Sequence, residues 1–326
     1  MELIARAIDR RAPLLAALGV EDTDGVRLFH GVAEGRPGLT VDRYGPILLV
    51  QTNREPLEPG EVEAISDTVQ RHLGVDLATA WNHRPAWREG FDRLHNPELP
   101  ASPEVREGGL RFDARPRHRG LDPLLFLDFR HVRRRVRTAG AQSVLNLFAY
   151  TCGVSVAASA GEAPEVWSVD FAASSLDIGE QNATRNGVGF HRVCDDVFPV
   201  VRQLAGLPVG GRRGRRPRFI PLEERRFDLV VLDPPKLARG RWGAVDLVRD
   251  YASLFKPAVL CVAPGGVIVA TNNVARVERD GWVEQLRRCA AKAGRELTDV
   301  EILTPDADFP SFDDRPPLKV AWCRVR

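Results

Sequence analysis

From Ser143 onward the sequence alternates short apolar runs with amphipathic segments, and this rhythm constrains the fold more than any other feature. Seven runs have the length and composition of strands: residues 143–148, 165–170, 191–195, 227–233, 267–273, 298–303 and 320–325. Strands that alternate with helices in this way are typical of an α/β doubly wound parallel sheet. We therefore expect a sheet of this kind in the C-terminal two thirds of the chain.

The N-terminal part lacks this regular alternation of apolar runs and helical segments. The length of 326 residues allows two domains. Residues 1–25 have a helical pattern, and short apolar stretches broken by glycine and proline predict strands with tight turns up to about residue 53. Residues 61–74 form an amphipathic helical pattern, and residues 78–85 can form a strand. Proline-rich connectors at 96–109 and 115–123 place the boundary near Pro116. The predicted domains are a small α+β domain at 1–115 and an α/β domain at 116–326.

Composition excludes several classes of protein. No apolar run approaches the roughly 20 residues that span a bilayer, and the charged, helical N-terminus is unlike a signal peptide. Five cysteines are scattered along the chain without a CxxC pair or a His/Cys cluster. We therefore expect a cytoplasmic protein with no membrane span and no metal site.

The net charge of +2 says little about binding partners, but the arginines are clustered. Three basic runs occur at residues 115–119, 130–135 and 212–218. Each run by itself is typical of a solvated loop, whereas three runs within or beside one domain favour a polyanionic partner.

In a doubly wound sheet the ligand lies at the carboxyl ends of the strands, so the residues after each strand matter most. The loop from Asn146 to Gly153 follows the first strand and lacks the GxGxxG pattern of NAD- and FAD-binding proteins. A plain strand-to-helix turn would have the same sequence. The loop therefore favours either such a turn or a cofactor without a pyrophosphate.

Acidic residues follow three of the strands. Asp170 ends the second strand, where a carboxylate can bind ribose hydroxyls, and either Asp195 or Asp196 could accept a hydrogen bond from an adenine amino group. A single aspartate at such a position is more often a helix N-cap. Acids at several strand ends together favour an adenosine-containing ligand.

The fourth strand ends in Leu232-Asp233-Pro234-Pro235-Lys236. Two prolines remove two backbone donors and hold the chain extended, which leaves the Asp233 carboxylate and the Pro234 carbonyl free to hold a planar nitrogenous group. A proline-rich turn without a function is the alternative. The fifth strand ends in Thr271-Asn272-Asn273, whose carboxamides can donate to and accept from the edge of a base.

These segments resemble the bacterial 23S ribosomal RNA methyltransferases, a family with a cytosine-5 enzyme and a guanine-N7 enzyme. The resemblance is carried, in chain order, by RLFHGVAEGRPGLTVDRYG, FLDFR, LNLFAYTCG, SVDFAASSLDIGEQNATRNG, the Asp196-Val197-Phe198 turn, LDPPK and DADFPSF. It implies a Rossmann-like class I methyltransferase dependent on S-adenosylmethionine, with a seven-stranded sheet whose last strand is antiparallel. It also implies an RNA substrate, either 23S rRNA or a large-subunit assembly intermediate, bound in part by residues 1–115. We expect no counterpart of the N-terminal PUA-type barrel that some relatives carry.

Carried over position by position, the resemblance assigns roles to individual residues. It implies that Asp170 binds the ribose, that Asp196 binds the adenine, and that Asp233 and Lys236 hold the target base beside Pro234. The further cofactor-binding residues that it implies are Phe126, Asp128, Arg130, Asn146, Phe148, Tyr150, Thr151, Gly153, Phe171, Asn182 and Val197, together with Asp233. It makes Asn272 and Asn273 the residues that orient the base, with Arg130 or Lys236 meeting a phosphate or carbonyl oxygen.

Two departures from the family pattern bear on the reaction. Cytosine-5 members resemble one another in a cysteine just after the fifth strand, because a thiolate must add to C6 of the base. This sequence has Asn272-Asn273 there, which favours methylation of a purine nitrogen, guanine N7 above all. Cys152 stands where most of the family has glycine, and we do not expect it to be a nucleophile. The alternatives are a cytosine-5 enzyme, a catalytically silent RNA-binding or ribosome-assembly protein, and a methyltransferase of proteins or small molecules.

Overall fold

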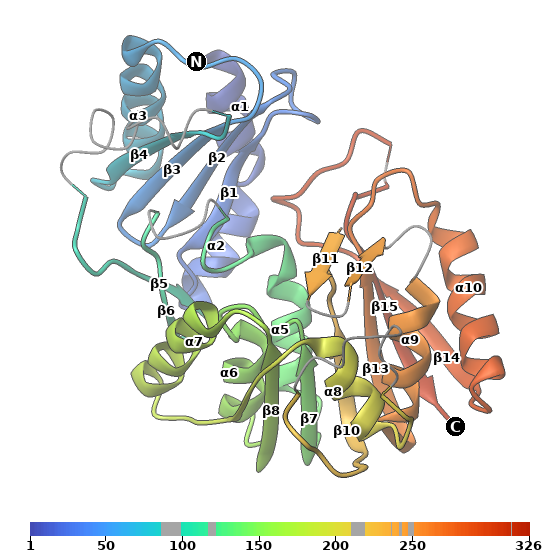
Figure 1. Ribbon diagram of the computed structural model, residues 1–326. Coiled ribbons are helices and arrows are strands. Elements are labelled where there is room, and N and C mark those ends of the chain that lie inside the picture. Colours follow the sequence, from blue (N-terminus) through green and yellow to red (C-terminus); the bar gives the residue numbers. More distant parts are fainter. Residues whose placement is uncertain are drawn as a thin grey trace. The chain divides into compact units, whose positions relative to one another are not determined.

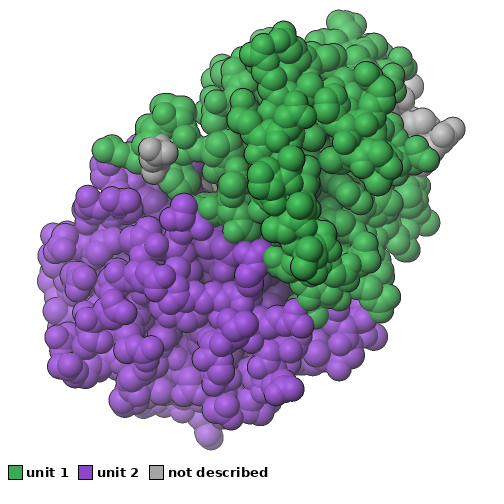
Figure 2. All heavy atoms as spheres, turned by 180° about the vertical axis from the view of Figure 1, so that it is seen from behind, with its two compact units in different colours: residues 1–130, 305–316 green, residues 131–304, 317–326 purple. Residues whose placement is uncertain are grey.

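A computed structural model of the chain divides into two compact units (Figures 1 and 2). Unit 1 comprises Met1–Arg130 and Pro305–Pro316, and unit 2 comprises His131–Thr304 and Pro317–Arg326. The structure describes residues 1–85, 99–116, 122–209, 219–235, 237–240, 243–246, 251–313 and 315–326. Unit 1 thus extends past residue 115 and takes in a segment from the C-terminal part of the chain, which differs from the division drawn from the sequence.

Unit 1 is an α+β unit. Its sheet has the order β1 (Gly25–His30), β2 (Leu39–Tyr44), β3 (Ile47–Thr52) and β4 (Ala78–His83), in which only β3 and β4 run parallel. Its helices are α1 (Glu2–Arg10), α2 (Ala12–Val20) and α3 (Pro59–Leu73), and a separate hairpin consists of β5 (Glu104–Glu107) and β6 (Leu110–Asp113). This architecture confirms the smaller N-terminal α+β domain.

The sheet of unit 1 is covered on both faces, since no residue of its four strands is exposed and all six residues of β3 are buried. One residue from each strand lies in register across the sheet: Phe29, Val41, Val50 and Trp81. These side chains share one core with the apolar faces of α1 and α3. The helix α3 begins with a capping box between Glu58 and Glu61 and ends at Gly74, which has a left-handed conformation. The first 20 residues form two helices rather than one, with Pro13 in the first turn of α2.

The segment 305–316 is held in unit 1 by buried charges. The guanidinium of Arg130 donates to Asp306 at 2.7 Å and to Asp308 at 2.7 Å, and the backbone N–H of Arg27 donates to Asp308 at 3.0 Å. Asp308 is completely buried. A buried carboxylate is stable only when it is paired and hydrogen-bonded, so these contacts explain why the segment belongs to unit 1.

Unit 2 contains the seven-stranded sheet predicted from the sequence. Its order is β14 (Leu297–Leu303), β15 (Lys319–Val325), β13 (Val262–Asn272), β10 (Phe227–Leu232), β7 (Ser143–Leu147), β8 (Glu165–Asp170) and β9 (His191–Cys194). The last strand, β15, is antiparallel to both of its neighbours, whereas the other pairs are parallel. The predicted Rossmann-like class I architecture is therefore confirmed.

The helices of unit 2 pack on this sheet (Figure 1). They are α5 (Arg130–Arg137), which begins at the last residue of unit 1, α6 (Gly153–Ala160), α7 (Ala173–Arg185), α8 (Val197–Leu204), α9 (Tyr251–Leu260) and α10 (Arg279–Lys292). A 3-10 turn, η2 (Leu127–Phe129), precedes α5 in unit 1, and a short hairpin, β11 (Leu237–Gly240) with β12 (Gly243–Asp246), follows β10. Within the described residues no helix combines the length and apolar character that crossing a membrane requires.

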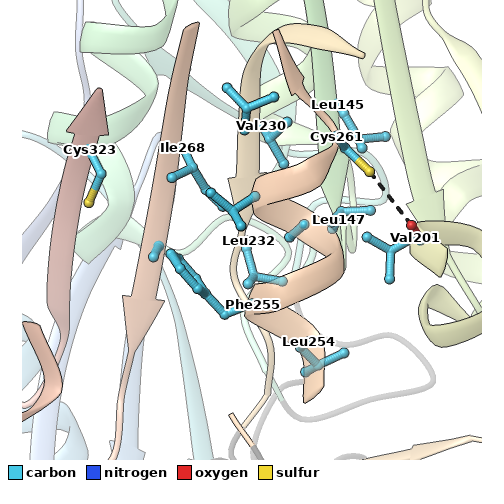
Figure 3. Close-up of a cluster of buried hydrophobic side chains, with 14 of the residues drawn as sticks. Leu145, Leu147, Val201, Val230, Leu232, Leu254, Phe255, Cys261, Ile268 and Cys323 are labelled. Carbon is cyan, nitrogen blue, oxygen red and sulfur yellow. Dashed lines mark hydrogen bonds between the residues drawn. The ribbon is translucent and has the colours of Figure 1, made fainter. Parts of the chain in front are cut away.

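The core of unit 2 fixes the strand ends that carry the site. Figure 3 shows Leu232 and Ile268, from β10 and β13, facing Phe255 of α9. All three side chains are fully buried. Burial of such side chains contributes about 1.5–3 kcal/mol each, so the ends of the central strands are held firmly in register.

Candidate functional site

The crevice of a doubly wound sheet opens where the strand order reverses, and in unit 2 this point lies between β7 and β10. From β7 the chain proceeds through β8 and β9 on one side and then through β10 and β13 on the other. The residues after the carboxyl ends of these strands form the candidate site. Most of the residues expected from the sequence lie there, at the ends of β7, β8, β9, β10 and β13.

The loop after β7 has an unusual backbone. Phe148, Tyr150 and Cys152 have φ angles of 61°, 49° and 59°, in the left-handed region that disfavours residues other than glycine. Each such residue costs on the order of 1 kcal/mol or more and persists only where its surroundings hold it. Three of them in one loop at the crevice are typical of a binding site.

Asp170 holds this loop from the end of β8. Its carboxylate accepts hydrogen bonds from the backbone N–H groups of Tyr150 at 2.9 Å and Ala172 at 2.8 Å. Burial raises the pKa of Asp170, and the backbone donors act in the opposite direction. A carboxylate has about four acceptor positions, so Asp170 keeps the capacity to bind ribose hydroxyls.

Two predicted cofactor residues are buried and act on the protein itself. Asn182 of α7 donates to the carbonyl of Thr151 at 3.2 Å, and Asn146 of β7 donates to the hydroxyl of Ser155 at 2.9 Å. Asn146 and Asn182 are 2% and 1% exposed. The structure thus places their carboxamides as supports of the loop and of α6, which begins at the buried Gly153.

The aromatic residues of the crevice differ in exposure. Phe171, directly after Asp170, is 52% exposed, whereas Phe148 is partly buried against the core of unit 2. An exposed aromatic ring at the end of a strand can cover a flat heterocycle.

The two aspartates after β9 accept hydrogen bonds from backbone N–H groups of the protein. Asp196 is the N-cap of α8 and accepts from Phe198 N at 3.0 Å through Oδ1. Asp195 accepts from Asp196 N and Ile220 N, both at 2.7 Å. The Val197 side chain is 1% exposed in the core, so it cannot contact a ligand, and the expected role of Val197 is limited to its backbone.

Asp233 is anchored by Thr271, for which the sequence predicted no role in the site. The hydroxyl of Thr271, at the end of β13, donates to Oδ1 of Asp233, and Tyr251 donates to the Thr271 carbonyl at 2.9 Å. The register of β10 and β13, which pairs Leu232 with Ala270, brings Asp233 and Thr271 together. Pro234 is buried. Lys236, expected to meet the target base, lies outside the described residues.

The expected pair of base-orienting asparagines needs correction. Successive side chains of β13 alternate between faces, so Asn272 lies on the face opposite to Thr271 and Asp233. Asn272 is 1% exposed, its Oδ1 accepts from Val274 N, and within the described part of the chain its Nδ2 has no hydrogen-bond partner. Asn273 is exposed. Asn272 therefore does not share a surface with the Asp233 carboxylate.

The Phe126–Arg130 segment belongs to unit 1, where Phe126 is 41% exposed and Asp128 is partly buried. The guanidinium of Arg130 is 1% exposed and donates to Asp306, Asp308 and the Gly25 carbonyl. The expectation that this guanidinium meets a cofactor, phosphate or carbonyl oxygen of a ligand is wrong, because it is buried and engaged inside unit 1.

Two further arginines of the basic run at 130–135 are buried or form contacts within unit 2. Arg133 is 3% exposed, and Arg135 forms two hydrogen bonds of 2.6 Å with Glu301 while its guanidinium lies 4.4 Å above the Trp322 ring. The run at 212–218 and most of the run at 115–119 lie outside the described residues.

Four of the five cysteine thiols are buried and are therefore poor nucleophiles. Burial raises the pKa of Cys152 to about 12 and that of Cys323 to about 12, and it also raises the pKa of Cys261 and Cys289. Cys152 is fully buried against α7, where a Cβ added at Gly179 would lie 2.5 Å from its sulfur. Its sulfur is therefore packed between the loop and α7.

Comparison with known proteins identifies the family to which this sheet and its strand-end loops belong. A family model described as S-adenosylmethionine-dependent methyltransferase matches residues 26–324. A ribosomal RNA large subunit methyltransferase of Deinococcus radiodurans is 32% identical over 300 residues, which cover 89% of this chain and 69% of the relative. Ribosomal RNA large subunit methyltransferase I of Erwinia tasmaniensis is 26% identical over 100% of this chain and 81% of its own length.

A solved structure has the same fold. SMU.776, described as a candidate methyltransferase and crystallised with SAH, superposes with a TM-score of 0.80 at 23% identity, over 99% of this chain and 80% of that chain. The family match at residues 26–324 includes the sheet of unit 2, apart from the last residue of β15, and the loops at its strand ends. The chain is therefore an enzyme that uses S-adenosylmethionine, and it belongs to the family of S-adenosylmethionine-dependent methyltransferases.

Proposed function

We propose that this enzyme methylates ribosomal RNA of the large subunit at a purine ring nitrogen, N7 of guanine. The names of its relatives support the RNA substrate. The chemistry of the thiols carries the choice of atom. C5 of cytosine becomes nucleophilic only after a thiolate adds to C6, whereas N7 of guanine already holds a lone pair. Asn272 and Asn273 occupy the end of β13 in place of a cysteine, and burial keeps Cys152 protonated.

The residues of the crevice fit the cofactor. The loop from Asn146 to Gly153 contains no charged side chain and no phosphate-binding glycine pattern, which suits a ligand without phosphates. In this proposal Asp170 binds the ribose, Phe171 covers the adenine, Asp196 accepts from its amino group, and the loop holds the methionine end. When bound, S-adenosylmethionine supplies a methyl group on a positively charged sulfur, ready for in-line displacement.

The target base would lie against the end of β10. In this proposal the Asp233 carboxylate, whose Oδ1 accepts from Thr271, and the Pro234 carbonyl accept hydrogen bonds from the N1–H and amino groups of guanine. The protein contributes by holding the base in line with the methyl group, and such alignment can supply roughly 7–11 kcal/mol. No general base is needed, since N7 carries no proton.

Nucleoside analysis tests the proposed substrate. Mass spectrometry of large-subunit rRNA from cells with and without the gene should show the loss of one methylated guanosine in the deletion strain. The modification should return with the wild-type gene. Loss of 5-methylcytidine instead, or an unchanged set of methylated nucleosides, would contradict the proposal.

A purified variant separates catalysis from cofactor binding. Asp233→Ala should abolish methyl transfer to rRNA and retain most of the affinity for S-adenosylmethionine, measured by calorimetry. Near-normal turnover of this variant would remove Asp233 from the site. Wild-type protein that binds S-adenosylmethionine but modifies no RNA would favour a catalytically silent protein or a different substrate.

A further inference from the structure

Unit 1 has a groove of its own, of about 330 Å³. Three parts of unit 1 that are far apart in sequence line it: α1, the turn after β1, and the segment 305–316. The lining residues, apart from Glu34 at its base, are Leu3, Arg6, Arg10, Ala33, Pro310 and Ser311. We refer to it as the α1 groove. Its volume is within the range of small-ligand sites.

The base of the α1 groove is held by buried ion pairs. Arg11 donates to both carboxylate oxygens of Glu34, at 2.8 and 3.0 Å, and to the backbone carbonyl of Asp308 at 3.2 Å. The side chains of Arg11 and Glu34 are only 3% and 4% exposed. Because these contacts join all three lining parts, the shape of the groove is preorganised before any ligand binds.

The walls of the groove carry an excess of positive charge. Arg6 and Arg10 lie one turn apart on α1, and their side chains are 64% and 60% exposed. Arg10 pairs with Glu34, but that one carboxylate also serves the buried Arg11. Arg6 pairs with Glu2, which is 77% exposed, and such surface pairs contribute about 0–1 kcal/mol. A phosphate group can therefore replace these carboxylates as the partner of both arginines.

Apolar surface lies beside the arginines. Leu3 is 44% exposed, and Phe312, which follows the lining residue Ser311, is 77% exposed. An aromatic side chain left in solvent is a stacking platform for an unpaired base, and base–aromatic stacking is worth roughly 1–3 kcal/mol per base. Arginines that bind phosphate next to such a platform are the usual combination of single-stranded nucleic-acid sites.

We propose that the α1 groove binds a single-stranded segment of the RNA substrate, with phosphates on Arg6 and Arg10 and an unpaired base on the apolar wall and Phe312. This inference rests on the proposed RNA substrate and adds a place where unit 1 captures it. The groove would raise the affinity for RNA without contributing to methyl transfer itself. An acidic peptide could also pair with the arginines, but it would make no use of Phe312.

Binding of a fluorescently labelled, single-stranded RNA of about 12 nucleotides, a length within the range of known single-strand sites, tests the groove. Removal of each phosphate contact reduces the slope of log affinity against log salt by about 0.7 for single strands, so Arg6→Ala/Arg10→Ala should reduce it by about 1.4. Phe312→Ala should weaken binding by roughly 5- to 150-fold, the range of one stacked base, without altering the slope. The matched control is Arg54→Ala/Arg71→Ala, two exposed arginines of unit 1 that do not line the groove.

The outcomes separate this inference from the proposed function. All variants are assayed for S-adenosylmethionine affinity and thermal unfolding, so that misfolding is detected. If Arg6→Ala/Arg10→Ala behaves like the control pair, the groove does not bind RNA, even where the wild type methylates rRNA. If polyglutamate competes as well as RNA and Phe312→Ala has no effect, the groove is an acidic-peptide site and the proposal is overturned. Absence of rRNA methylation by the wild type would reject the proposed function alone, because oligonucleotide binding still reports on the groove.

Discussion

The Thr271 hydroxyl donates a hydrogen bond to the Asp233 carboxylate and thereby joins the ends of β13 and β10 at the crevice. Thr271 is itself fully buried, and Tyr251 donates to its backbone carbonyl. The contact leaves Asp233 with one carboxylate oxygen anchored and sets the direction of the other. We therefore regard Thr271 as a residue that positions Asp233 in the proposed reaction.

Removal of this hydroxyl should slow methyl transfer. A hydrogen bond to a charged group contributes about 1.5–3 kcal/mol, so Thr271→Val should lower kcat by roughly 10- to 100-fold, while Thr271→Ser should stay near the wild type. Affinity for S-adenosylmethionine should change little in both variants. Steady-state kinetics on rRNA would measure the effect, and equal kcat values for the valine and serine variants would show that the hydroxyl does not position Asp233.

Asp170 should be required for the cofactor rather than for the target base. Asp170→Asn replaces one acceptor oxygen with a donor, so it cannot accept from both Tyr150 N–H and the ribose as the carboxylate can. We expect the affinity for S-adenosylmethionine to fall by roughly 10-fold or more, since each hydrogen bond to a charged group is worth about 1.5–3 kcal/mol. Calorimetric titration would measure it. Unchanged affinity would place the ribose elsewhere.

Cys152 and Gly179 should behave as a matched pair. An added Cβ at Gly179 would lie 2.5 Å from the Cys152 sulfur, so Gly179→Ala alone should destabilise the fold by about 1–3 kcal/mol. Cys152→Gly removes that sulfur and suits the φ of 59°, so the double variant should recover much of the loss. Urea unfolding of the four proteins gives the coupling energy, and additive effects would argue against the contact.

Stability in mild acid should depend on His30. Burial, followed by the Arg27 guanidinium, lowers the pKa of His30 to about 4 from its ordinary 6.5. Between these pH values the unfolded chain binds a proton that the folded protein does not, so stability should fall as the pH decreases from 6.5 to 4. His30→Asn should show a smaller decrease over this window. Urea unfolding at several pH values would test it, and parallel profiles for the two proteins would contradict the assignment.

The local pattern of the sequence was enough to predict the strands of the sheet in unit 2, whereas its antiparallel last strand was implied only by the family resemblance. Apolar runs of strand length recur between helical segments, and an acid or a double proline follows each of several strands. Strand periodicity and helix capping depend on neighbours within a few residues, so these features can be recognised without the fold. The positions of Asp170 and Asp233 at strand ends follow from the same reasoning.

Only the tertiary structure decided what several of the polar residues do. Arginine is a common ligand-binding residue, yet the charge of Arg130 is neutralised by Asp306 and Asp308, which lie more than 170 residues away in the sequence. Thr271 and Asn272 are equally polar neighbours, but the register of β13 against β10 turns only Thr271 toward Asp233. The role of a charged or polar side chain depends on which distant groups satisfy it, because an unpaired buried polar group is costly. That choice is made by chain topology, which local sequence patterns do not contain.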